Sequence, residues 1–199
     1  MLTVGLSGGI ASGKSTISAL FARRDIPIID TDVISRGLLE PGESAYHQLC
    51  EHFGDTMVTA DGLIDRKKLR QLIFSNTEEK AWLETMLHPL IYQRSQKSIA
   101  ENSTADYVLV VIPLLFETNF QAQVDRICVV DCTADLQIER LVKRDKIDEI
   151  LARKMLDQQL SNDQRVARAD DVIDNRGDGS DLDAQVEALH RSYLSLSPG

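Results

Sequence analysis

The chain has 199 residues, of which 43% are hydrophobic and 27% are charged. At roughly 150 residues per domain, this length predicts one globular unit with room for a small inserted subdomain, and the composition favours neither a disordered nor a fibrous protein. The net charge of −9, from 22 Lys and Arg against 31 Asp and Glu, disfavours a broad grip on nucleic acid or anionic lipid. We therefore expect any phosphate site to be local, and we expect no nucleic-acid, membrane or obligatory protein partner.

The first nine residues lack a basic stretch followed by an apolar one, so they predict a strand and not a secretion signal. The longest apolar stretch, residues 108–116, is about half the length of a membrane span and contains Pro113. The three cysteines form no C-x-x-C pair, which indicates neither disulfides nor zinc, and we expect buried thiols. These features predict a cytoplasmic protein.

Short apolar runs rich in β-branched residues predict strands at residues 2–6, 26–29, 107–112, 127–130 and 172–173. Between these runs, apolar residues recur at the three- and four-residue spacing of helices, as in Ile17, Leu20 and Phe21. Strands that alternate with helices favour a parallel sheet covered on both faces. The prediction is a three-layer α/β fold with a five-stranded parallel sheet.

The alternation is uneven, because nearly eighty residues separate the second predicted strand from the third. Residues 33–103 have helical patterns, and such an insertion often builds a substrate pocket. Within it, Pro89 is expected to kink or end the helix that carries Trp82 and Leu87. Residues 144–168 predict a second, uninterrupted polar helix with little to bury, which we expect to be mobile.

The first strand leads into a segment, residues 8–15, that matches the motif G-x-x-x-x-G-K-[ST] and precedes a helix. Gly8 and Gly13 permit backbone angles that let successive N–H groups surround a phosphate at the positive end of this helix. Lys14 is expected to reach the β- and γ-phosphates, and the Ser15 hydroxyl to bind Mg²⁺. The predicted nucleotide-binding residues are Gly8, Ala11, Ser12, Gly13, Lys14, Ser15 and Thr16.

The second predicted strand delivers Asp30-Thr31-Asp32 at its carboxyl end, where open α/β sheets bind ligands. In an extended segment, residues 30 and 32 point the same way, so one carboxylate can hold the strand end while the other faces the phosphates. Asp32 is the candidate general base and a second candidate ligand of Mg²⁺. The alternative for both acids is helix capping.

Five segments then carry a resemblance to a known family: LSGGIASGKST (6–16), DTDVISR (30–36), LHPLI (87–91), PLLFE (113–117) and ADDVIDN (169–175). The chain resembles the dephospho-coenzyme A kinases, which are P-loop kinases, over essentially its whole length. The family more often has Gly at position 11 and Ala at position 31, where this chain has Ala11 and Thr31. Both departures leave the lysine and the two acids in place.

The resemblance implies a single kinase domain, 1–199, with a substrate-binding insertion at 33–103 and an Arg-bearing lid at 144–168. It implies transfer of the γ-phosphoryl group of ATP to the ribose 3′-hydroxyl of dephospho-coenzyme A, with Mg²⁺, in the last step of coenzyme A synthesis. Such transfer needs an anion cradle, a metal, a hydroxyl-orienting carboxylate and mobile cations. The alternatives are another small-molecule or nucleotide kinase, and an adenine-nucleotide sensor without turnover.

Arg140 and Arg144 are the first candidates for the mobile cations, because the i, i+4 spacing puts them on one face of the helix after the fourth strand. Further candidates follow in the polar segment: Arg153, Arg165 and Arg168. The resemblance to kinase lids favours a catalytic role for Arg140 and Arg144. The alternative is a solvated helix face with ion pairs, and it applies also to Arg153, Arg165 and Arg168.

Three further residues are predicted to bind substrates. Arg36 lies one helical turn after Asp32, where its fork can hold an acceptor phosphate or pair with a nearby acid. His88 belongs to the matched LHPLI segment and either contacts the acceptor or packs at the proline. Asn175 follows the fifth strand, where related kinases meet the adenine, and its alternative is an ordinary turn residue.

Overall fold

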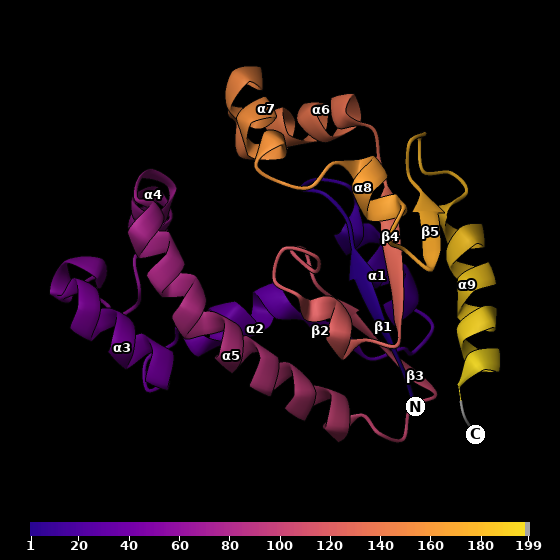
Figure 1. Ribbon diagram of the computed structural model, residues 1–199, viewed down its shortest axis with the longest axis horizontal. Coiled ribbons are helices and arrows are strands. Elements are labelled where there is room, and N and C mark those ends of the chain that lie inside the picture. Colours follow the sequence, from indigo (N-terminus) through magenta and orange to yellow (C-terminus); the bar gives the residue numbers. More distant parts are fainter. Residues whose placement is uncertain (198–199) are drawn as a thin grey trace. The chain divides into compact units, whose positions relative to one another are not determined.

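The computed structural model describes residues 1–197, with the side chains of residues 55 and 74 excepted, and it divides into two compact units (Figure 1). Residues 31–98 form the smaller unit, and the rest of the chain forms the larger one. The larger unit contains β1 (Leu2–Ser7), α1 (Lys14–Ala22), β2 (Ile28–Asp30), β3 (Tyr107–Val111), β4 (Arg126–Asp131), α6 (Ala134–Asp145), α7 (Glu149–Asp157), α8 (Asn162–Val166), β5 (Asp171–Asp174) and α9 (Leu182–Leu196). The smaller unit contains α2 (Thr31–Leu38), α3 (Ser44–Phe53), α4 (Arg66–Ser75) and most of α5 (Thr77–Glu101).

The strands form one parallel sheet in the order β2-β3-β1-β4-β5. All five predicted strands are therefore confirmed, and so is their parallel arrangement. β2 is shorter than predicted because Pro27 has no N–H to donate to a neighbouring strand. Its carbonyl oxygen instead accepts a 3.0 Å hydrogen bond from the N–H of Leu109.

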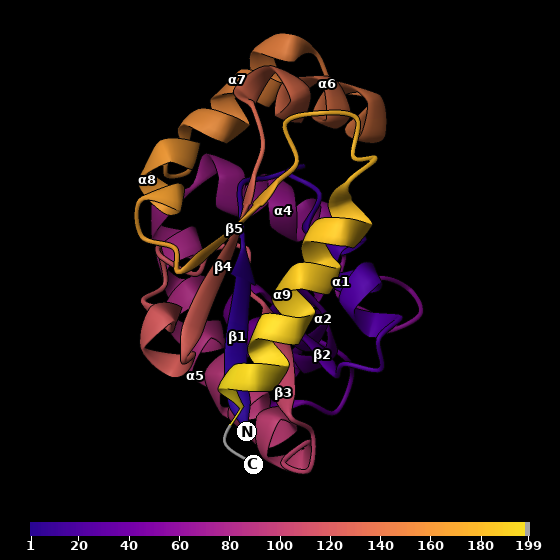
Figure 2. The same ribbon diagram turned by 90° about the vertical axis from the view of Figure 1, so that its right-hand side faces the viewer.

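Helices cover both faces of the sheet, which confirms the three-layer prediction. All six residues of β1 are buried, and Leu2, Val4 and Leu6, which point to the same face of the sheet, share one core with α1 and α9. In that core Phe21 of α1 stacks on Tyr193 of α9, with ring centroids 6.2 Å apart. α9 runs along the sheet beside β5 (Figure 2), and α8 packs against β4.

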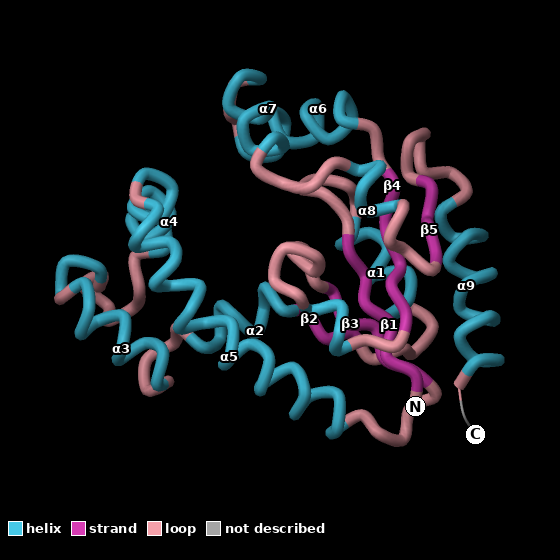
Figure 3. The backbone as a smooth tube through the Cα atoms, viewed as in Figure 1, coloured by secondary structure: helices cyan, strands magenta, loops and turns pink. Residues whose placement is uncertain are grey.

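The chain between β2 and β3 is helical apart from short connections (Figure 3). This smaller unit has its own hydrophobic core, to which α5 contributes Trp82 and Leu87. Pro89 was predicted to kink or end this helix, and the second alternative is wrong, because α5 continues to Glu101. Pro89 removes one backbone hydrogen bond, but Leu87 before it and Ile91 after it pack into the same core and keep the helix continuous.

The prediction of an uninterrupted polar helix over residues 144–168 is also wrong. α6 ends at Asp145, and Lys146 adopts a left-handed conformation with φ of 54°. Two new helices then begin at side-chain caps, Asp148 for α7 and Ser161 for α8. The segment also buries more than expected, because Ala152 packs in a small cluster between α6 and α7.

Among the described residues, the helices are too short or too polar to cross a bilayer.

Candidate nucleotide-binding site

The loop between β1 and α1 has the backbone that its glycines were predicted to permit. Gly8 has φ of 154° and Gly13 has φ of 104°, and Gly13 caps the N-terminus of α1. A Cβ atom at Gly8 would lie only 2.7 Å from the Oγ atom of Ser12, and one at Gly13 would overlap the side-chain amide of Asn175. Both positions therefore require glycine, and the loop that they form leads into the positive N-terminal end of α1, which favours an anion.

Lys14 extends over this loop. Its Nζ atom donates hydrogen bonds of 2.7 Å to the carbonyl oxygen of Gly8 and 2.8 Å to that of Gly9. The ammonium group is thereby held beside the carbonyls at the start of the loop. Ser15 and Thr16 follow in the first turn of α1, and both are exposed. The loop thus combines backbone donors, a cation and accessible hydroxyl groups, which is the donor set that a polyphosphate and its metal require.

Two side chains from distant segments converge on the carbonyl oxygen of Ser12. The Nδ2 atom of Asn175, directly after β5, donates to it at 2.7 Å, and Asn175 is buried. Nη1 of Arg140, on α6, donates to the same oxygen at 3.4 Å and lies 3.4 Å from Sγ of Cys132. The structure therefore brings Asn175 and Arg140 to the loop.

Arg144 is placed differently from Arg140. It makes a bidentate ion pair with Asp145, with N–O distances of 2.7 and 2.8 Å, and 56% of its side chain is exposed. The hydrogen bonds that Arg144 donates to the Asp145 carboxylate raise the pKa of the guanidinium, so Arg144 keeps its charge. In this conformation Arg144 has the solvated, ion-paired position that was the alternative to a catalytic role.

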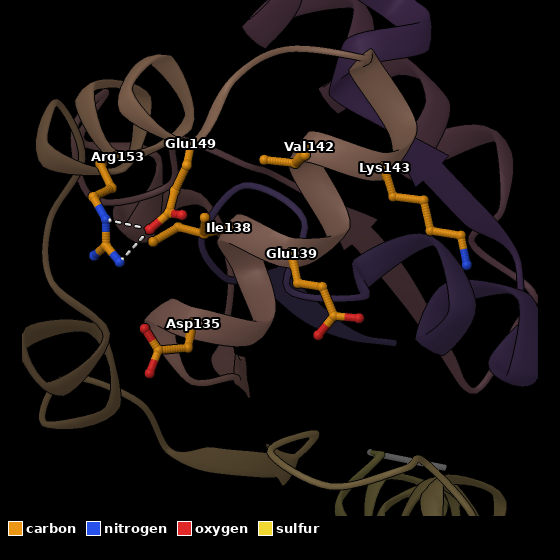
Figure 4. Close-up of a pocket in the computed structure, with 7 residues that line it drawn as sticks. All are labelled: Asp135, Ile138, Glu139, Val142, Lys143, Glu149 and Arg153. Atoms are coloured by element: carbon orange, nitrogen blue, oxygen red, sulfur yellow. Dashed lines mark hydrogen bonds and ion pairs between the residues drawn. The ribbon is translucent and has the colours of Figure 1, made fainter.

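Arg153 lies at a pocket of about 450 Å³ between α6 and α7, beside its ion-pair partner Glu149 (Figure 4). Apolar Ile138 and Val142 line the same pocket. Because it is paired with Glu149 and exposed, Arg153 also has the ion-paired surface position.

Arg168 lies over the ring of Phe116, at 5.7 Å from its centroid.

Arg165 has neither of its two predicted environments, because its side chain is only 3% exposed. Its Nη2 atom pairs with Oε1 of Glu117 at 3.2 Å, and its Nη1 atom donates to the carbonyl oxygen of Leu160. Burial lowers the pKa of the guanidinium, and the Glu117 carboxylate opposes this effect. The predictions of a mobile cation and of a solvated face are both wrong for Arg165, since a buried pair fixes it in place.

Asp32, Arg36 and His88 lie in the smaller unit. The prediction that residues 30 and 32 share an extended segment is wrong, because α2 begins at Thr31 and places Asp32 in its first turn. Arg36 is exposed, and its Nε atom donates to the carbonyl oxygen of Asp32 at 3.1 Å. His88 is half-buried on α5, directly before Pro89.

The comparison with known proteins settles the family. The family profile described as dephospho-CoA kinase matches residues 2–181. A dephospho-CoA kinase of Shewanella oneidensis is 45% identical over 98% of this chain and 94% of its own length, and that of Escherichia coli K12 is 43% identical over the same shares. The chain belongs to the dephospho-CoA kinase family.

Solved structures agree on the fold. TT1252 from Thermus thermophilus, 25% identical, superposes with a TM-score of 0.83 over 100% of this chain and 98% of its own. The dephospho-CoA kinase from Campylobacter jejuni, 23% identical, superposes with a TM-score of 0.74 over 98% of both chains. The resemblance inferred from the five sequence segments is confirmed.

The oxygen donors of the loop fit a magnesium ion. Mg²⁺ is usually held by one or two protein oxygens together with substrate phosphates, and not by a complete protein cage. The exposed hydroxyl of Ser15, which follows Lys14 directly, is one such protein oxygen. The described residues contain no group of three or more His, Cys, Asp or Glu side chains that would hold a metal independently of a nucleotide.

Sequence reasoning missed two glutamines that contact the loop. Oε1 of Gln159 accepts a 2.9 Å hydrogen bond from the N–H of Ile10, and Nε2 of Gln137 donates to the carbonyl oxygen of Ile10 at 2.6 Å. A signal for Gln137 was present, because it lies three residues before Arg140 and therefore on the same helical face. Gln159 lies in a connection without periodicity, and only the folded structure identifies it.

Proposed function

We propose that the protein transfers the γ-phosphoryl group of ATP to the ribose 3′-hydroxyl of dephospho-CoA and so produces CoA. The observation that carries this proposal is the match to dephospho-CoA kinases along residues 2–181, in a chain whose loop positions Lys14 beside the Gly8 and Gly9 carbonyls. The use of ATP also supports the proposal that the protein works in the cytoplasm.

In the proposed reaction the loop acts by positioning and charge neutralisation. Backbone N–H groups of the loop around Gly13 hold the β-phosphate, and Lys14 reaches the β- and γ-phosphates. Asp32 accepts the proton of the 3′-hydroxyl while that oxygen bonds to the γ-phosphorus. The bond from the γ-phosphorus to its bridging oxygen breaks, and ADP leaves with the bond's electron pair. Ser15 and Asp32 would hold Mg²⁺, which would neutralise phosphate charge.

The remaining predicted residues have roles around this centre. We assign residues 33–103 to acceptor binding, with Arg36 on a phosphate of dephospho-CoA and His88 on the acceptor. We assign residues 144–168 to a lid and Asn175 to the adenine of ATP. Arg140, already at the loop, and Arg144 supply positive charge to the transferring phosphoryl group. Because Arg144 is paired with Asp145 here, its role requires that this exposed pair opens.

A coupled ADP-release assay tests the proposal, with dephospho-CoA, adenosine and AMP offered separately. We expect multiple turnovers with dephospho-CoA and little ADP with the other two acceptors. A Lys14→Ala variant, which loses the cation at the loop, is the matched negative control. Preference for adenosine or AMP would indicate another small-molecule kinase, and ATP binding without multiple turnover would indicate a sensor.

A further inference from the structure

The tip of the phosphate-binding loop is held on both of its backbone polar groups by side chains outside the loop. Gln159 accepts from the N–H of Ile10, and Gln137 donates to the carbonyl oxygen of Ile10. We call Gln137 and Gln159 the Ile10 clamp. The next residue, Ala11, has φ of 57°, a left-handed conformation that a non-glycine residue adopts only when its surroundings impose it.

The clamp fits tightly against the loop. Gln137 is 4% exposed, so its amide must find partners within the protein. A Cβ atom at Gly9 would overlap the Nε2 atom of Gln137 and would lie 3.4 Å from Nη1 of Arg165. The absence of a side chain at position 9, which the motif leaves unspecified, is therefore what lets the clamp approach the loop.

The backbone next to Gln159 is fixed by the buried ion pair of Arg165 and Glu117. Nη1 of Arg165 binds the carbonyl oxygen of Leu160, and the N–H of Leu160 donates to Glu117 at 3.4 Å. Since Arg165 is itself paired with Glu117, both backbone polar groups of residue 160 are fixed. The side chain of Gln159 therefore leaves a constrained backbone, and its contact with Ile10 is specified by the fold.

The two clamp residues flank α7 and the second half of α6. Gln137 lies near the start of α6, and Gln159 lies just after the end of α7. The segment between them carries Arg140 and Arg144, the two candidate cations. The clamp therefore fastens both ends of this segment to the part of the loop that precedes Gly13 and Lys14.

We propose that Gln137 and Gln159 are positioning residues that fix the loop tip at Ile10. By holding both ends of the segment that carries Arg140 and Arg144, they also fix the position of these cations relative to the bound triphosphate. The proposal rests on the proposed kinase function. Catalysis of this kind depends on donors that are already oriented before the substrate binds. The clamp supplies that orientation without touching substrate, so its loss should lower kcat more than it weakens nucleotide binding.

The test begins with hydrogen exchange of the Ile10 amide, measured by NMR on the full-length protein without nucleotide. Gln159→Met should speed this exchange by about tenfold or more, because it removes the acceptor. Gln159→Glu keeps an acceptor oxygen and should retain the protection of the Ile10 amide. Gln137→Met and Gln137→Glu both remove the side-chain N–H that donates to the Ile10 carbonyl oxygen. Gln158→Met, at the exposed neighbouring position, is the matched control and should change nothing.

Kinetics and binding complete the test. Gln159→Met should lower kcat by about tenfold or more while the affinity for ADP stays within about threefold. Unchanged Ile10 exchange in Gln159→Met, or equal exchange in Gln159→Met and Gln159→Glu, would overturn the clamp. Faster exchange with unchanged kcat would overturn its positioning role. If the parent protein fails to phosphorylate dephospho-CoA, the proposed function falls, and the exchange pattern alone still decides whether the clamp exists.

Discussion

Ala11 illustrates how one residue stores strain in a functional loop. Its φ of 57° is a conformation that costs a non-glycine residue roughly 1–2 kcal/mol, whereas glycine adopts it freely. Ala11→Gly should therefore raise the free energy of unfolding by about 0.5–1 kcal/mol, after the greater chain entropy of unfolded glycine is subtracted. Urea unfolding followed by circular dichroism measures this change.

Ala188→Gly is the matched control for Ala11→Gly. Ala188 is exposed in the middle of α9, in the same compact unit, and the same substitution there should lower the free energy of unfolding by about 1 kcal/mol. Opposite signs at the two positions would locate the strain in the loop. Equal destabilisation at both would show that Ala11 is not strained.

Asp32 occupies the first turn of α2, so the same carboxylate can act in chemistry or merely stabilise a helix N-terminus. Asp32→Asn should leave ATP affinity within about threefold and lower kcat by about 10²-fold or more, because a neutral amide cannot accept the hydroxyl proton. Steady-state kinetics and nucleotide titration give the two values. Asp135→Asn, at an exposed first-turn position of α6, controls for the helix effect. Equal losses of ATP binding and turnover at position 32 would favour the capping role.

At the scale of elements, α6 carries two arginines with different partners: Arg140 contacts the loop at Ser12, and Arg144 pairs with Asp145. Arg144 is exposed and ion-paired, so its removal should change the free energy of unfolding by no more than about 0.5 kcal/mol. If the lid draws it onto the phosphates, Arg144→Ala should lower kcat by about tenfold or more and leave ATP binding without acceptor nearly unchanged.

Arg153→Ala provides the comparison for Arg144→Ala, because Arg153 is also exposed and paired with an acid on its own helix. We expect normal kinetics for this variant. Unchanged kcat in Arg144→Ala at every acceptor concentration would assign Arg144 to the solvated helix face as well.

The elements that the sequence predicts well are those whose signal is local. The apolar runs of β1 and β3 predict strands from their own residues, and the spacing G-x-x-x-x-G-K-[ST] predicts the position of the loop before α1. The failures arise where packing decides: α5 passes through Pro89 because both sides of the proline share one core. α2 begins at Thr31, one residue after β2 ends, and no pattern in Asp30-Thr31-Asp32 separates a strand end from a helix start. Gln159 and the Arg165–Glu117 pair depend on contacts across more than forty residues.

At the scale of the whole molecule, burial controls the chemistry of the three cysteines. Cys128 and Cys132 are buried, and Cys50 is half-buried. Burial raises the pKa of the Cys128 thiol to about 12 and also raises that of Cys132. Because a thiol with a raised pKa stays protonated, Cys128 should remain unreactive even at pH 9, where an ordinary thiol is largely ionised.

The rate at which each thiol reacts with a chromogenic thiol reagent at pH 9 tests this expectation. The native protein should react first at Cys50, and Cys128 and Cys132 should react only after the protein is unfolded in denaturant. Mass spectrometry of labelled peptides identifies each site. Rapid labelling of Cys128 in the native protein would show that the core between β1, β4 and α9 opens readily.

The two compact units suggest why the acceptor should be large. The larger unit contains the phosphate-binding loop, and the smaller unit, with a hydrophobic core of its own, contains Asp32, Arg36 and His88. A nucleoside alone would not need a separate unit, whereas an adenosine that carries a pantetheine arm has remote groups whose binding energy can orient its 3′-hydroxyl. Dephospho-CoA shortened in its pantetheine arm should therefore show kcat/KM lowered by about 10²-fold, with part of the loss in kcat itself.

Steady-state kinetics with the shortened acceptor measure this loss, and phosphorus NMR of the product locates the new phosphate. We expect the phosphate on the 3′-oxygen of the ribose for dephospho-CoA and for the shortened acceptor, because both carry the same adenosine and the arm changes only how well the 3′-hydroxyl is oriented. A loss confined to KM would mean that the arm contributes affinity without orientation. Equal efficiency with adenosine, or a phosphate on the 5′ side, would remove the reason for a separate acceptor unit and would favour a general nucleoside or nucleotide kinase.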